Sequence, residues 1–91
     1  MNNRVATKTV TEALTVVADA KLSWNLGAKH LDEGTTYEPS KEIVALAKKF
    51  SSYKSQDLAK IATYLKLYLD DPKADTGYFW LSKALDRVLV L

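Results

Sequence analysis

The sequence predicts an all-α domain, a four-helix bundle-like fold with one long N-terminal helix. Two observations support this prediction. Apolar residues recur at the helical period in four separate stretches, and residues that cap or break helices lie between these stretches. At 91 residues the chain has the size of a single domain, residues 1–91. The predicted helices cover approximately residues 8–31, 40–50, 56–69 and 77–90.

The first predicted helix carries a seam of alternating small and large residues. Both sets recur every seven positions, and they are four and three positions apart: Ala6, Val10, Ala13, Val17, Ala20, Trp24, Gly27 and Leu31. This heptad pattern is typical of a helix that packs closely against another helix, and we expect Gly27 to be a point of close contact. Residues 5–11 also alternate with a period of two, which leaves a strand as the alternative there.

Residues near both ends indicate the limits of this first helix. Thr9 and Glu12 match a capping box, and Asn3 is an alternative cap one turn earlier. We expect residues 1–4 to fray. Gly34 suits the left-handed conformation that closes many helices.

Serine, threonine and proline delimit the three shorter helices. Ser40 and Ser55 suit the caps of the second and third helices, and Thr76 suits the cap of the fourth. Pro72 disfavours helical geometry at the residue before it, so the third helix is expected to stop near residue 69. The apolar stripes of these helices contain Ile43, Leu46, Ala47, Phe50, Leu58, Ile61, Ala62, Leu65, Leu69, Leu81, Ala84, Leu85 and Val88.

The composition is that of a soluble globular protein, with 47% hydrophobic and 26% charged residues. The absence of cysteine excludes a disulfide framework and a thiolate metal site, and it fits a reducing compartment. No apolar run approaches the ~20 residues of a membrane span. Lys8 and Glu12 interrupt the apolar run that a secretory signal needs. We therefore expect a cytoplasmic protein with no membrane span.

No group of residues matches a catalytic or metal-binding pattern. The single histidine, His30, has only Asp32 and Glu33 as neighbouring ligand types, which is too few for a transition-metal site. The acidic stretch 71–82 resembles a calcium loop, but Ser82 stands where the bidentate glutamate is needed. We therefore expect no catalytic residues, no bound metal, no cofactor and no enzymatic activity.

Apolar residues outside the predicted stripes favour a protein partner. The first helix carries Ala18, Leu22 and Leu26 away from its seam. The third and fourth helices carry the predicted partner-binding residues Tyr64, Leu67, Tyr68, Phe79 and Trp80. Large apolar patches usually mark interfaces, and Trp and Tyr are common at their energetic hot spots. These residues predict a small non-enzymatic protein-binding module, an inhibitor, adaptor or accessory factor that docks on a larger protein. The alternative is that the helices pack more globularly and cover these side chains themselves.

The alternative function is nucleic-acid binding through the lysine-rich region 41–66. This region contains six lysines and only two acidic residues, which gives it a local charge of +4. The lysines expected to contact phosphates are Lys41, Lys48, Lys49, Lys54 and Lys60. Nucleic-acid surfaces usually carry a stronger basic bias. A helix-turn-helix across the second and third helices fits poorly with either Ala47 or Ala45 as its small residue.

The seam of the first helix also predicts a homodimer. At 1.5 Å per residue the seam is about 36 Å long, whereas a partner helix of 11–14 residues spans about 16–21 Å. A second copy in an antiparallel two-fold arrangement would cover the seam. The predicted self-association residues are Ala13, Val17, Ala20, Trp24, Gly27 and Leu31. The alternative is that the second and fourth helices, placed end to end, cover it within one subunit.

Overall fold

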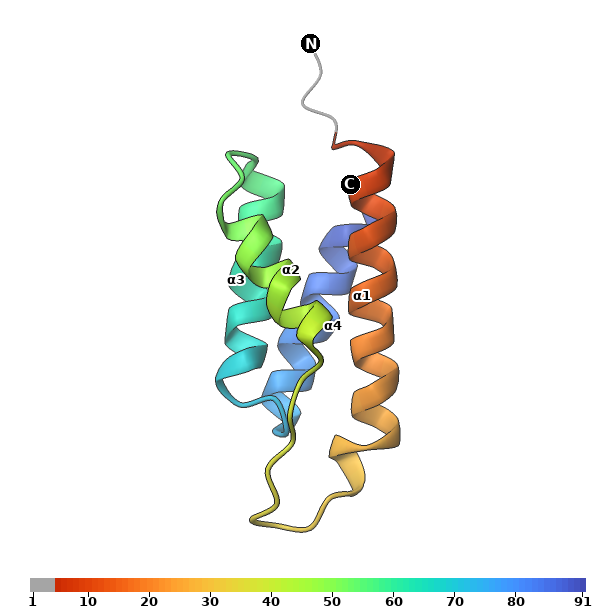
Figure 1. Ribbon diagram of the computed structural model, residues 1–91, viewed down its shortest axis with the longest axis vertical. Helices are drawn as coiled ribbons and strands as arrows, with labels where there is room; N and C mark the ends of the chain where they lie inside the picture. The colour runs from red at the N-terminus through yellow and green to blue at the C-terminus, as the bar shows by residue number, and fades with distance from the viewer. Residues whose placement is uncertain (1–4) are drawn as a thin grey trace.

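A computed structural model describes residues 5–91, and these residues form four α-helices and one short 3₁₀ turn without any strand. The helices run alternately down and up in a bundle (Figure 1). They are α1 (Thr7–Leu26), α2 (Lys41–Ser51), α3 (Gln56–Asp70) and α4 (Asp75–Leu89), and the turn η1 (Ala28–His30) follows α1. The predicted all-α, four-helix bundle-like fold is confirmed.

The helices pack around a square in which α1 and α3 occupy opposite corners. Helix α4 packs against α3 and α1, and α2 packs against α3 and α1. Within the described residues, neither diagonal pair, α1 with α3 or α2 with α4, packs directly together. The outer faces of α2 and of the α3–α4 pair therefore look in different directions (Figure 1).

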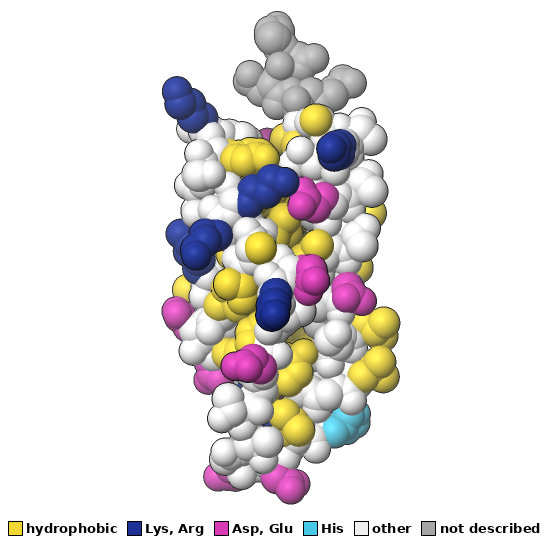
Figure 2. All heavy atoms as spheres, viewed as in Figure 1, with side chains coloured by type: hydrophobic (Ala, Val, Ile, Leu, Met, Phe, Trp, Pro, Cys, Tyr) yellow, Lys and Arg dark blue, Asp and Glu magenta, His cyan; other side chains and the backbone are white. Residues whose placement is uncertain are grey.

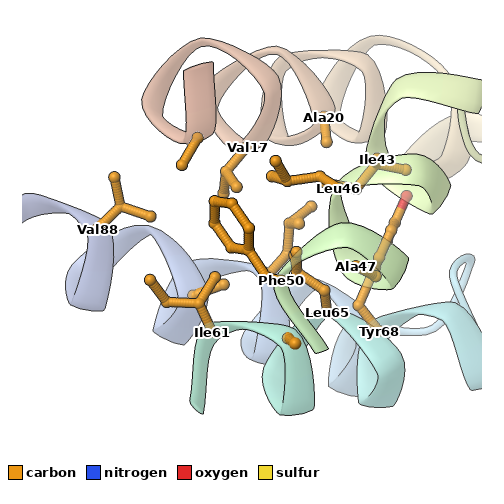
Figure 3. Close-up of a cluster of buried hydrophobic side chains, with 14 of the residues drawn as sticks. Val17, Ala20, Ile43, Leu46, Ala47, Phe50, Ile61, Leu65, Tyr68 and Val88 are labelled. Carbon is orange, nitrogen blue, oxygen red and sulfur yellow. The ribbon is translucent and has the colours of Figure 1, made fainter. Parts of the chain in front are cut away.

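The core lies where the four helices meet. The ring of Phe50 from α2 occupies the centre, with Val17 from α1 above it and Ile61 from α3 below it (Figure 3). Val88 closes the core from the side of α4. All four side chains are completely or almost completely buried. Because each helix contributes an apolar stripe, burial of these stripes is the main stabilising contribution to the fold.

Two predicted serine caps are confirmed. The hydroxyl oxygen of Ser40 accepts a hydrogen bond from the backbone N–H of Ile43 at 3.3 Å. The hydroxyl oxygen of Ser55 accepts one from the N–H of Leu58, also at 3.3 Å. Each serine satisfies one of the free amides of a first turn. The observed limits of α2 and α3 consequently agree with the predicted limits to within one residue.

The first helix ends earlier than predicted. Helix α1 stops at Leu26, and the Gly27 N–H donates to the carbonyl of Ser23 as a capping bond. The chain then makes one 3₁₀ turn that buries Ala28, and it becomes extended at Leu31. Gly27 therefore ends the helix instead of continuing its seam, which corrects the prediction that the helix reaches residue 31.

The predicted capping box at the start of the first helix is also wrong. Helix α1 begins one turn earlier, at Thr7, with Ala6 as its cap. The Glu12 carboxylate, which the capping box assigned to the Thr9 amide, instead accepts a hydrogen bond from Lys49. The strand alternative fails from Thr7 onward because these residues are helical. The predictions for Asn3 and for fraying of residues 1–4 lie outside the described residues.

The fourth helix begins two residues before its predicted start. Ala74, not Thr76, is the cap of α4, and it makes no side-chain capping bond. The turn before the helix is closed by the Ala74 N–H, which donates to the Asp71 carbonyl at 3.2 Å. Gly77 is buried in the first turn of α4, against this same carbonyl. A close backbone approach, which the sequence pattern does not reveal, therefore sets the start of α4.

Candidate functional site

Three aromatic side chains meet on the outer face of α3 and α4. The rings of Tyr64 and Trp80 are stacked across the two antiparallel helices, with centroids 5.6 Å apart and planes inclined by 18°. Phe79 meets Trp80 edge to face, with centroids 5.1 Å apart. Both geometries are favourable for aromatic pairs. We call Tyr64, Leu67, Phe79 and Trp80 the aromatic surface.

The aromatic surface combines buried support with exposed contact area. Tyr64 and Trp80 are half-buried, whereas Phe79 is 51% exposed and Leu67 is also exposed. The Lys83 ammonium lies 5.7 Å from the centroid of the Phe79 ring, one helical turn further along α4. The structure thus brings four of the five predicted partner-binding residues to the surface.

Tyr68 is the fifth predicted partner-binding residue, and it points into the core. Its side chain is 1% exposed and runs from α3 past Ala47 towards Ile43 on α2 (Figure 3). A partner therefore cannot reach this side chain in the folded subunit, which corrects the expectation that it faces outward. The spacing of Ile61, Leu65 and Tyr68 already follows the inward stripe of α3.

Burial changes the ionisation of two tyrosines at this end of the core. It raises the pKa of Tyr68 to about 12, with a smaller contribution from the nearby Tyr37 hydroxyl. Burial also raises the pKa of Tyr37 above its usual value. Both shifts arise because a phenolate is poorly solvated away from water. These tyrosines are neutral structural groups near pH 7.

The predicted self-association residues lie mostly inside the subunit. The seam residues Ala13, Val17, Ala20 and Trp24 are buried where α1 packs against α2 and α4. The Trp24 ring packs on Tyr78 of α4, with centroids 4.4 Å apart. Gly27 and Leu31 are half-buried at the end of the bundle. The seam is thus covered within one subunit. Helices α2 and α4 lie along its two sides and are not placed end to end, as the alternative had expected.

The opposite face of α1 is apolar and uncovered. Leu22 is 55% exposed, Leu26 is 73% exposed, and Ala18 and Leu14 are also exposed. Hydrophobic side chains project along the lower half of α1 (Figure 2). The sequence pattern predicted that Ala18, Leu22 and Leu26 lie away from the seam, and their exposure confirms it.

The lysines of the alternative nucleic-acid site are spread over α2, the following turn and α3. Lys41, Lys48, Lys54 and Lys60 are exposed, and positively charged side chains gather over this part of the molecule (Figure 2). Lys49 instead donates to the Glu12 carboxylate at 2.8 Å. This hydrogen bond raises the pKa of Lys49. Lys49 is therefore engaged with α1.

A surface depression at the start of α2 was not predicted from the sequence. Its volume is about 650 Å³, and it is open to solvent. It is lined by residues 38–41 together with Val44, Ala45 and Lys48. We call it the α2 depression. The sequence feature that could have indicated the depression is that Val44 and Ala45 lie outside the apolar stripe of α2, between Lys41 and Lys48.

The residues tested for metal and acid–base chemistry do not converge on a site. His30 is exposed in the 3₁₀ turn. Within residues 5–91, no group of three or more histidine or acidic side chains is placed to hold a metal ion. In the acidic loop, Lys73 donates hydrogen bonds to the carbonyls of Asp32 and Thr35, which ties two connections together. None of the described helices is long and apolar enough to cross a membrane.

Comparisons of this chain with models of protein families, with curated proteins and with solved structures give no match.

Proposed function

We propose that this chain is a small non-enzymatic protein-binding module, an inhibitor, adaptor or accessory factor that docks on a larger protein through the aromatic surface. The observation that carries the proposal is the half-exposed Phe79 ring, which is held in place by Trp80 and, through it, by Tyr64. Aromatic side chains, Phe included, are enriched at the core of interfaces, and Trp and Tyr are common among their energetic hot spots.

The arrangement supports binding in two ways. An aromatic side chain buries roughly 150–250 Å², so covering the exposed half of Phe79 contributes about 2.5 kcal/mol at ~25 cal/mol per Å². Because the Trp80 ring already packs against Phe79, less side-chain freedom is lost when a partner covers it. Lys83 beside the ring adds a cation at the rim.

Photo-crosslinking from defined positions tests this proposal. A photoreactive phenylalanine analogue is placed at Phe79 and, in a second protein, at Leu22, which has similar exposure on α1. We expect the Phe79 probe to give one dominant crosslinked protein that the Leu22 probe does not give. Crosslinks of equal yield to the same larger protein from both positions would argue against a docking site on α3 and α4.

Nucleic-acid binding is the second candidate, and the exposed lysines of α2 and α3 favour it. Four of the five predicted phosphate-contacting lysines form no ion pair among the described residues, whereas Lys49 is paired with Glu12. Binding through several phosphates weakens steeply with salt. A gel shift with mixed-sequence DNA and RNA that is absent at low salt would exclude this candidate.

A homodimer through helix one stays a proposal. Because the seam of α1 is buried, the dimer would have to use other residues of this helix. In this fold a second copy meets Leu14, Leu22 and Leu26 on the outward face of α1 and not the buried seam. Sedimentation equilibrium up to about 1 mM detects even a dimer of roughly −4 kcal/mol. A dimer that dissociates on Leu22→Asp would support this face, and a strict monomer would exclude self-association.

A further inference from the structure

The α2 depression combines apolar lining residues with two lysines of α2. Val44, which is 42% exposed, and Ala45 form the floor together with Pro39. Lys41 and Lys48 lie seven residues apart along α2, about 10 Å at 1.5 Å per residue. Hydrophobic atoms are exposed between positively charged side chains over α2 (Figure 2).

The two lysines carry charge that the described chain does not neutralise. Among residues 5–91 the ion pairs are Lys49 with Glu12 and Arg87 with Asp57, so neither Lys41 nor Lys48 is paired. Glu38 is the single acidic residue in the lining. Along α2, the exposed Val44 and Ala45 therefore lie between two unpaired lysines.

We propose that the α2 depression binds an acidic amphipathic peptide segment of a partner protein. An aliphatic side chain of that segment packs on Val44 and Ala45, and carboxylates about two helical turns apart meet Lys41 and Lys48. Complementary charge around an apolar contact favours this partner over competing ones. A second copy of this chain is disfavoured because it would bring the same lysines face to face.

An acidic peptide fits the depression better than a nucleic acid does. Phosphate contacts need cations alone, whereas here the cations enclose exposed aliphatic side chains that gain from burial.

The depression is a separate surface from the aromatic surface. It lies on α2, and α2 and α4 do not pack together within the described part of the chain. The two surfaces share no residue. The inference about the depression stands or falls independently of the proposed function of Phe79 and Trp80.

An unbiased peptide selection tests the proposal. A displayed library of random peptides of about 18 residues, five turns of helix, is selected against the purified full chain. We expect enriched peptides with an aliphatic residue flanked by Asp or Glu. Their amide chemical-shift changes on the ¹⁵N-labelled protein should concentrate at residues 38–48.

Three variants connect binding to the chemistry of the depression. Lys48→Glu and Val44→Ser should each weaken the enriched peptides about tenfold, the equivalent of 1.4 kcal/mol. Lys66→Glu, the same charge change at an exposed position on α3, should leave affinity within about twofold. All three positions are exposed, so the fold is retained and circular dichroism checks it.

Several outcomes would overturn the proposal. The selected peptides could lack enrichment of acidic residues, or their chemical-shift changes could centre on α1 or on the aromatic surface. Lys48→Glu and Lys66→Glu could also weaken peptide binding equally. An oligonucleotide that binds with loss on Lys48→Glu but none on Val44→Ser would assign the lysines to phosphate contacts instead.

Discussion

The α-carbon of Gly77 in the first turn of α4 lies directly against the backbone of Asp71, which closes the turn between α3 and α4. A Cβ at this position would overlap the Asp71 carbonyl oxygen and lie 3.3 Å from the carbonyl carbon. We expect Gly77→Ala to destabilise the protein by about 1–3 kcal/mol, as overpacking of a filled site does. The penalty exceeds the gain in helix propensity, which is about 1 kcal/mol.

Urea unfolding followed by circular dichroism measures the Gly77 effect. Thr76→Ala, at the neighbouring exposed position, is the matched control and should change the unfolding free energy by less than about 0.5 kcal/mol. A Gly77→Ala protein as stable as the wild type would show that the turn can move away from the helix.

Ala20 tests whether the seam of α1 is used within one subunit. Its methyl group faces Leu46 of α2 in the core (Figure 3), so Ala20→Leu should cost about 1–3 kcal/mol by overpacking. The loss of stability caused by Ala20→Leu should not depend on protein concentration, because the lost contacts are intramolecular. A midpoint that rises with wild-type concentration and no longer rises in the variant would place Ala20 in a dimer interface.

The serine caps of α2 and α3 should each contribute to stability. Ser40→Ala and Ser55→Ala each remove an acceptor for a first-turn amide, and we expect a loss of about 1 kcal/mol per cap. Ser51→Ala, near the exposed end of α2, should be neutral by comparison. Denaturant titration of the three variants tests this order, and equal effects would remove the assigned role of the caps.

Burial of Tyr68 predicts a loss of stability at alkaline pH. Its pKa rises from about 10 in the unfolded chain to about 12 in the folded chain, so the folded state holds the proton more tightly. This contribution is fully present below pH 10 and is lost as pH rises through 12. Tyr37 acts in the same direction.

Unfolding free energies measured from pH 9 to 12 check the Tyr68 assignment. Tyr68→Phe removes the buried ionisable group, so the variant should show a shallower decline over this range than the wild type. Tyr53→Phe is the matched control, because Tyr53 is an exposed tyrosine. A wild-type slope retained in Tyr68→Phe would contradict the prediction.

The apolar stripes were sufficient to predict four helices and most of the core. Ser40 and Ser55 also revealed where α2 and α3 begin, because a cap acts through residues three positions away in the sequence. The first and last helices were placed less well. Their limits depend on tertiary contacts, such as the Gly77 approach to Asp71 and the burial of Ala28 after Gly27.

The candidate surfaces were also predicted in part, and the rest depended on contacts between helices. The sequence predicted that Phe79 and Trp80 lie off the stripe of α4, but it did not reveal that Trp80 stacks on Tyr64 of another helix. Tyr68 was misplaced although its spacing from Ile61 and Leu65 follows the inward stripe of α3, where its side chain is buried. The seam of α1 could not distinguish an internal partner from a second copy, since both require small residues at close contacts.

The affinity of the purified partner for two matched variants tests the proposed protein-binding function most directly. Phe79→Ala and Leu22→Ala each truncate a half-exposed apolar side chain within a helix, the first on α4 and the second on α1. We predict that Phe79→Ala raises the Kd at least tenfold, which is 1.4 kcal/mol, whereas Leu22→Ala changes it less than twofold. Equal affinities for Phe79→Ala and the wild type, or a larger loss for Leu22→Ala, would contradict docking through the aromatic surface.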